Sequence, residues 1–269
     1  MAPVAKWARQ TSHQKECTKD SEVLSALVTE DWEDVPNSRD DQVATQFHLL
    51  GVPHILIISA IPLAAGLLAW LSRKHENGAR AIRLLLGGSI LLNELVWYWY
   101  YVHQGWFEFP YTLPLHLCDV VLWLTIYTSF SQKQWSYNLI YYWGLAGTTM
   151  AVVTPDVSAP VASYLTIRFF LAHGGILIVI LFLTWGGILR PSKGSYWKAW
   201  VSLQVYIAAI SIFNYFFRTN YFYICEKPDA ASLLNFMGPW PVYVLVGDAI
   251  ALILFWFLYL PYRGREFAR

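Results

Sequence analysis

Apolar residues fill seven long stretches of this chain, and short polar segments separate them. About 20 apolar residues let a helix cross about 30 Å of hydrocarbon, and five of the stretches reach that length while the third and fourth are shorter. The pattern predicts an all-α polytopic membrane protein with seven transmembrane helices in one bundle. The stretches are Leu49–Leu71, Ala81–His103, Leu113–Phe130, Tyr137–Val153, Ser163–Leu189, Tyr196–Phe217 and Pro239–Leu260.

Basic residues alternate between the two sides of these stretches. They lie in the first, third and fifth connections and at the C-terminal end, whereas the second and fourth connections have none and the sixth has only Arg218 and Lys227. Because Lys and Arg favour the cytoplasmic side of short loops, the alternation predicts an outside or lumenal N-terminus and a cytosolic C-terminus. The residues of the basic side are Arg73, Lys74, Arg80, Lys133, Arg190, Lys193, Arg263, Arg265 and Arg269.

Charge and hydropathy divide the chain into three segments. Residues 1–48 hold nine acidic and five basic residues, and they are predicted to form a polar, disordered tail. Residues 49–262 form the predicted seven-helix transmembrane domain, and residues 263–269 a short basic cytosolic tail. No basic start followed by an apolar run is present near residue 1, so we expect no cleavable signal peptide.

The composition argues against a soluble domain. Hydrophobic residues make up 56% and charged residues 14% of the chain, with a mean hydropathy of +0.38, whereas soluble domains carry about 25% charged residues. The chain has no phosphate-cradling Gly-rich loop, zinc-ligand spacing or nucleic-acid patch, so we expect no cofactor, metal or nucleic-acid partner. Three cysteines do not make a disulfide framework; Cys17 and Cys225 fall on the outer side and either pair or stay as unpaired thiols.

Polar residues inside the predicted spans gather in their outer halves. An ionisable group at a helix centre in lipid costs about 2.5–3.5 kcal/mol, so each needs a partner or a purpose. The bias predicts a polar cavity that opens outward or sideways into the outer leaflet; the alternative is a set of ion pairs that lock helices together. The residues inside the spans are Glu94, His116, Cys118, Asp119, Arg168, His173 and Asp248, and Asp156 and Asn220 follow the outer ends of the fourth and sixth spans.

Cys118 and His173 suggest nucleophilic chemistry. A thiol becomes a nucleophile when a neighbouring histidine takes its proton. His116 lies two residues from Cys118 and would point to another helix face, which makes it a poor base. His173 differs from Cys118 in predicted depth by roughly two turns, a difference that helix tilt or a later helix start would absorb.

Each of these residues also has a structural interpretation. A cysteine within a helix often serves as a small buried hydrophobe, and His173, followed by two glycines, fits a packing residue at a close helix crossing. His54 and His103 are interpreted as interfacial. The aromatic run Trp97–Tyr101 is typical of an interfacial belt.

Several motifs, in this order, resemble the YwaF-like integral membrane family, which includes the eukaryotic transmembrane protein 164. The resemblance covers about residues 47–262. The motifs are Leu113–Asp119 (LPLHLCD), Gly144–Gly147 (GLAG), Thr154–Asp156 (TPD), Arg168–Gly174 (RFFLAHG), Asn220–Tyr223 (NYFY), Lys227–Pro228 and Gly238–Pro241 (GPWP).

The resemblance implies a cysteine-dependent phospholipid acyltransferase, an O-acyltransferase that needs no cofactor. Cys118 would take an acyl chain as a thioester, and His173 would be the general base. A thiol about 5–10 Å below the headgroups would lie near the ester carbonyls of membrane lipids. Asn220, Tyr223, Arg168 or Asp119 would orient His173 or hold the phosphate.

The partners implied are membrane lipids as acyl donor and acceptor, and the location is a bacterial plasma membrane or, in a eukaryote, the endoplasmic reticulum. Lipid hydrolysis by the same residues is a close variant. Two alternatives stay open. The outward cavity could belong to a transporter or receptor, although the chain shows no paired half-sequences. Asp119 or Glu94 could instead be the proton donor of an acid-catalysed lipid or isoprenoid enzyme.

Overall fold

The structure, a computed structural model, describes residues 47–74, 77–155, 157, 159–228 and 233–264. Every regular element of this part is a helix: α3 (Val52–Ser72), α4 (Gly78–His103), α5 (Leu117–Ser131), α6 (Gln134–Trp143), the π-helix η1 (Gly144–Thr148), α7 (Thr149–Val153), α8 (Tyr164–Trp185), α9 (Ser195–Phe217), the short 3₁₀ segments η2 (Tyr221–Tyr223) and η3 (Leu233–Phe236), α10 (Val242–Tyr259) and η4 (Leu260–Tyr262). The all-α prediction is confirmed for the described residues.

The helices coincide with the seven predicted stretches. Five of them, α3, α4, α8, α9 and the unit Val242–Tyr262, are long and apolar enough to cross a membrane. The third stretch is the 15-residue α5, and the fourth is divided into α6, η1 and α7. The number of crossings and the orientation of the termini stay predictions.

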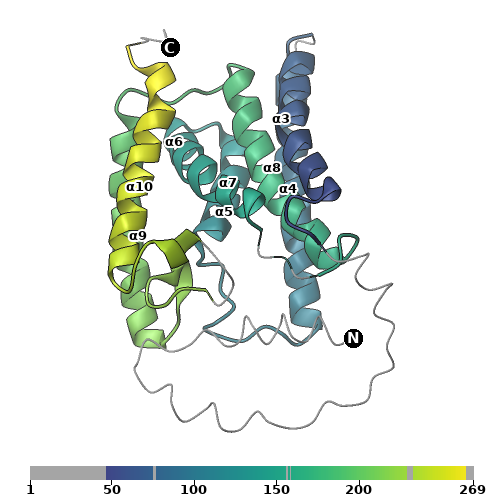
Figure 1. Cartoon of the computed structure of the whole chain (residues 1–269). Coiled ribbons are helices and arrows are strands. Elements are labelled where there is room, and N and C mark those ends of the chain that lie inside the picture. Colours follow the sequence, from purple (N-terminus) through teal and green to yellow (C-terminus); the bar gives the residue numbers. More distant parts are fainter. Residues whose placement is uncertain (1–46, 75–76, 156, 158, 229–232, 265–269) are drawn as a thin grey trace.

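Figure 1 shows two ends of the bundle. The end where α3 and α8 finish and where the described chain stops after α10 carries Arg73, Lys74, Arg190 and Arg263; we call it the basic end. The end where α4 and α9 finish and α8 begins is called the site end. The predicted acidic tail lies mostly outside the described residues.

The helix α8 is the centre of the bundle. It packs against α3, α4, α5, α6 and α7, and its Ile176, Ile180, Phe182 and Leu183 are almost completely buried. Gly144 permits the closest approach to it, because a Cβ at that position would lie only 2.5 Å from Cδ1 of Ile180.

The helix α5 begins four residues later than predicted and well inside the bundle, whereas α4 and α9 extend further toward the site end (Figure 1). Two tyrosine hydroxyls hold the preceding segment. Tyr206 of α9 donates to the carbonyl of Leu115, and Tyr221 accepts from the N–H of Leu113 and donates to the carbonyl of Pro110. In a helix that began earlier, the carbonyl of Leu115 would accept from the N–H of Asp119; here it accepts from Tyr206 instead, and α5 starts at Leu117.

Two interfacial interpretations require correction, those of the aromatic run Trp97–Tyr101 and of His54, whereas the interpretation of His103 stays a prediction. Trp97 and Tyr101 are buried, while Trp99 is exposed, because residues four apart share a helix face that here turns into the bundle. His54 is fully buried, with Leu50 N donating to its Nδ1 and its Nε2 bonded to the carbonyl of Val152. His103 is exposed and stacks on Trp99.

Candidate functional site

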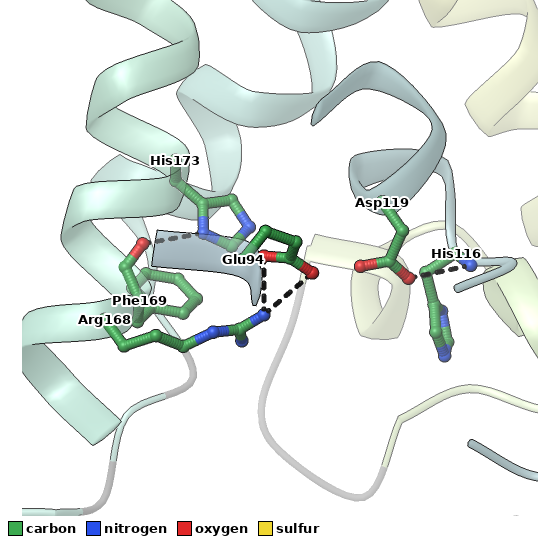
Figure 2. Close-up of polar contacts among 6 residues, drawn as sticks. All are labelled: Glu94, His116, Asp119, Arg168, Phe169 and His173. Atoms are coloured by element: carbon green, nitrogen blue, oxygen red, sulfur yellow. Dashed lines mark hydrogen bonds and ion pairs between the residues drawn. The ribbon is translucent and has the colours of Figure 1, made fainter. Parts of the chain in front are cut away.

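One ring nitrogen of His173 is hydrogen-bonded, and the other has no hydrogen-bond partner among the described residues. Nδ1 lies 2.9 Å from the carbonyl oxygen of Phe169, one turn earlier on α8. Because a carbonyl only accepts, Nδ1 carries the hydrogen of the neutral ring and Nε2 carries the lone pair. The ring also stacks on Phe169 at 4.2 Å (Figure 2). Among the described residues, Nε2 has no hydrogen-bond partner, so it is oriented as a proton acceptor.

Cys118 is the second residue of α5 and has a free, half-buried thiol. The height of Cys118 along the bundle can be compared with that of α8 through Gly144, which contacts both helices. A Cβ at Gly144 would lie 3.4 Å from Val121 Cγ1 of α5 and 3.5 Å from Ile176 Cγ2 of α8. Figure 1 shows that α5 and α8 run in the same direction, toward the basic end. Cys118 and His173 each precede these neighbours by three residues, and residues three apart are close on a helix surface.

Cys118 and His173 therefore lie at one level on adjoining helices. The depth difference of two turns that the sequence indicated disappears because α5 begins deep in the bundle. No hydrogen bond joins the two side chains in the described part of the chain. That is compatible with chemistry, since catalytic hydrogen bonds often tighten only when substrate is bound.

An ion pair joins α8 to α4, and its arginine precedes His173 by five residues. Nη2 of Arg168 is 3.2 Å and 3.5 Å from the two carboxylate oxygens of Glu94, which is 1% exposed. The guanidinium lies 4.1 Å from the centre of the Trp97 ring, a cation–π arrangement. Arg168 also interacts electrostatically with Asp119, so these charges connect α4, α5 and α8 (Figure 2).

His116 and Asp119 form the start of α5. The backbone N–H of His116 donates to Oδ2 of Asp119 at 3.1 Å, and the His116 side chain caps the N–H of Asp119 in return, a reciprocal capping box. The His116 ring packs 5.2 Å from the Tyr221 ring. The prediction that His116 is a poor base for Cys118 stays a prediction.

The remaining predicted site residues have structural partners or lie outside the described part. Asn220 accepts from the N–H groups of Cys225 and Glu226 and donates to the carbonyl of Glu226, so its amide orders this loop. The carbonyl of Tyr223 accepts from the hydroxyl of Tyr243, and its ring lies 5.5 Å from His116.

Asp248 belongs to the contact between α9 and α10. Its Oδ1 accepts from Trp200 Nε1 at 3.1 Å and from Gln204 Nε2 at 2.6 Å, and the structure does not bring it to the Glu94–Arg168 pair. Asp156 and Cys17 lie outside the described residues. Cys225 is disulfide-bonded, so the alternative of an unpaired thiol is wrong for this cysteine.

The hydroxyls of Tyr206 and Tyr221 hold the segment before α5, and the sequence did not indicate this role. Tyr221 is 1% exposed, and its backbone is held by both amide atoms of Asn214. Burial raises the pKa of Tyr221, so its hydroxyl stays neutral and can donate and accept at once. The roles of Tyr206 and Tyr221 could not be recognised in a chain so rich in aromatic residues, because tyrosine is also frequent at membrane interfaces.

Comparison with known proteins gives one family and one relative. Residues 48–259 match the TMEM164 family. An uncharacterized protein of Treponema pallidum (strain Nichols) is 26% identical over 232 residues, which cover 83% of this chain and 93% of the relative. No solved structure matches the chain.

Proposed function

The chain belongs to the TMEM164 family, and from that premise we propose that it is an integral membrane acyltransferase in which Cys118 and His173 move acyl chains of glycerophospholipids. Seven crossings, with the site end outside or in a lumen, are part of the proposal. The apolar helices and the basic residues at the opposite end support this orientation.

The observation that carries the proposal is the shared level of Cys118 and His173, combined with the free Nε2 of His173. Nucleophilic catalysis by cysteine needs a base that is oriented by a third group. The carbonyl of Phe169 is that third group here. His54 offers a contrast, since both of its ring nitrogens are occupied.

The proposed reaction has two halves. Sγ of Cys118 attacks the ester carbonyl of the donor lipid while Nε2 of His173 takes the thiol proton. The ester C–O bond breaks, and the departing lysolipid alcohol takes that proton from His173, which leaves an acyl thioester. An acceptor hydroxyl then attacks the thioester and gives its proton to His173. The C–S bond breaks, and the thiolate recovers the proton; with water as acceptor, the same steps hydrolyse the donor.

With Cys118 at the level of His173, the proposed site is deeper than the depth of about 5–10 Å expected from the sequence. His173 is the tenth residue of α8, about 13 Å along the helix at about 1.5 Å per residue. In this proposal, an ester at ordinary depth has to sink between the helices to react.

A thiol-reactive acyl probe tests the proposal in reconstituted vesicles. We expect the probe to label Cys118, Cys118→Ala to lose the label, and His173→Ala to slow labelling by about 10²-fold or more, the usual contribution of a general base. The control is His103→Ala, which alters an exposed histidine of α4 and should label normally. Labelling that is independent of His173, or located elsewhere, contradicts the proposal.

The same variants separate the alternatives. Ligand flux that Cys118→Ala leaves unchanged would favour a transporter or receptor. Loss of lipid turnover in Asp119→Asn or Glu94→Gln, together with normal turnover in Cys118→Ala, would favour acid catalysis. The hydrogen bond of Asp119 to the N-cap and the ion pair of Glu94 argue against either carboxyl as a free proton donor.

A further inference from the structure

We propose that Arg168 binds the phosphate group of the lipid whose ester reaches Cys118, and so selects phospholipids over neutral acylglycerols. The proposal rests on the proposed function for the identity of the reacting ester. Its own evidence is the set of unused donors on the guanidinium.

A guanidinium has five N–H donors in a planar fork. Only Nη2 of Arg168 is bonded, to Glu94. Nε is buried without a hydrogen-bond partner, and Nη1 has none among the described residues. Trp97 covers one face of the group. Buried donors without partners need an explanation, and a planar fork matches the oxygens of a phosphate.

The other residues considered for the phosphate do not offer free donors. The amide of Asn220 is bonded to its own loop, and Asp119 is a carboxylate that caps α5 and would repel a phosphate. Lys227 is in the connection after α9 and lies 5.2 Å from the Tyr243 ring. Arg168 is thus the cation that combines proximity to the Cys118 level with free donors.

The spacing along α8 agrees with a phospholipid. Arg168 precedes His173 by five residues, which is about 7.5 Å nearer to the site end. In a glycerophospholipid, only the glycerol carbons and oxygens separate the ester carbonyl from the phosphate. A lipid with its carbonyl at the level of His173 therefore has its phosphate near the level of Arg168.

Removing the charge of Glu94 and removing that of Arg168 should have opposite effects on phosphate binding. Glu94 already pairs with Arg168, so a phosphate has to compete with this carboxylate. Removing the charge of Glu94 should strengthen phosphate binding, and removing the guanidinium should abolish it. If Arg168 were only a structural partner of Glu94, both changes would have the same effect.

The experiment uses a photo-crosslinkable phospholipid and a matched diacylglycerol, each added to the full chain in neutral sugar-detergent micelles. We expect Glu94→Gln to label with the phospholipid at least as well as the unaltered chain. In the double variant Glu94→Gln/Arg168→Gln, phospholipid labelling should fall by about tenfold or more, which corresponds to the loss of a hydrogen bond to a charged group. Diacylglycerol labelling of this variant should not change. The double variant removes both charges of the Glu94–Arg168 pair, and thermal unfolding checks that it folds.

Normal phospholipid labelling of the double variant would overturn the proposal. So would equal loss in Glu94→Gln and the double variant, or equal competition by inorganic phosphate, which would indicate a site for a soluble anion. Crosslinking that depends on Arg168 while Cys118 takes no acyl group would remove the proposed function and leave this inference standing. Acylation of Cys118 with crosslinking that ignores Arg168 would do the reverse.

Discussion

The two ends of the bundle use polar side chains in different ways. At the basic end, they connect helix termini: Arg73 donates to the carbonyl of Trp185 at 2.7 Å, and Arg83 donates to the carbonyls of Ser129 and Phe130. At the site end, His173 and Arg168 keep donors or acceptors that no described residue uses. Arg83 Nε and Ser129 Oγ at the basic end also have no hydrogen-bond partner in the described part of the chain. The two ends differ in that Arg83 joins α4 to α5, whereas the described hydrogen bond of the His173 ring stays within α8.

Buried hydroxyl pairs reinforce the basic end. Tyr137 bonds to Thr184 at 2.7 Å and Tyr142 to Ser195 at 2.8 Å, and both tyrosines are 0% exposed. Each pair gives two hydroxyl groups a hydrogen-bond partner in a surrounding that has no water to supply one. Changes here should therefore reduce stability, and changes at the site end should reduce activity.

The largest expected effect is that of His173→Ala on acyl transfer. The turnover should fall by about 10²–10⁴-fold, because the base that takes the thiol proton is lost. The midpoint of thermal unfolding in detergent should change little, because the described hydrogen bond and stacking contact of the ring are both with Phe169 of the same helix. A large loss of stability with turnover retained would assign this histidine to packing.

Arg83→Gln tests the basic end. Arg83 is 7% exposed, and loss of its charged hydrogen bonds to α5 should cost about 1.5–3 kcal/mol of unfolding free energy. Turnover per folded molecule should not change. The matched control is Arg80→Gln, an exposed arginine on the same helix. Equal effects of the two substitutions would show that the bonds to α5 contribute nothing.

Gly144→Ala tests the packing that brings the site helices to one level. The added methyl group would lie 2.5 Å from Ile180 Cδ1, and such overpacking costs about 1–3 kcal/mol. The control is Gly88→Ala, where the methyl group would meet nothing within 4 Å and helix propensity favours alanine by up to about 1 kcal/mol. Thermal unfolding of both variants in one detergent measures the difference, and an unfolding midpoint that does not fall in Gly144→Ala contradicts the prediction.

Tyr221→Phe should cost about 1 kcal/mol of unfolding free energy for each of the two hydrogen bonds that are lost, from Leu113 N–H and to the Pro110 carbonyl. Its specific consequence is local: the segment before α5 loosens, and acyl labelling of Cys118 slows. Tyr141→Phe removes a hydroxyl that donates to the carbonyl of Leu258 near the basic end, and labelling should stay normal. The two labelling rates, compared at equal folded fraction, decide whether Tyr221 positions Cys118; equal rates would show that it does not.

The sequence predicted the helices well and their neighbours poorly. The boundaries of α4, α9 and α10 lie within a few residues of the predicted stretches, because prolines and polar connections interrupt apolar runs at recognisable positions. The partners of Asp248 and the burial of His54 could not be predicted, since hydropathy does not reveal which face of a helix meets which neighbour.

The amino-acid sequence by itself determined that this is a helical membrane protein, which residues can do chemistry, and which end is basic, because these properties depend on local composition and length. Only the tertiary structure decided that Cys118 and His173 lie at one level. That result depends on where α5 begins, and hydroxyls about 90 and 110 residues away in the chain, on Tyr206 and Tyr221, hold the segment that precedes it. Bonds between residues so far apart in sequence leave no periodic pattern from which they could be predicted.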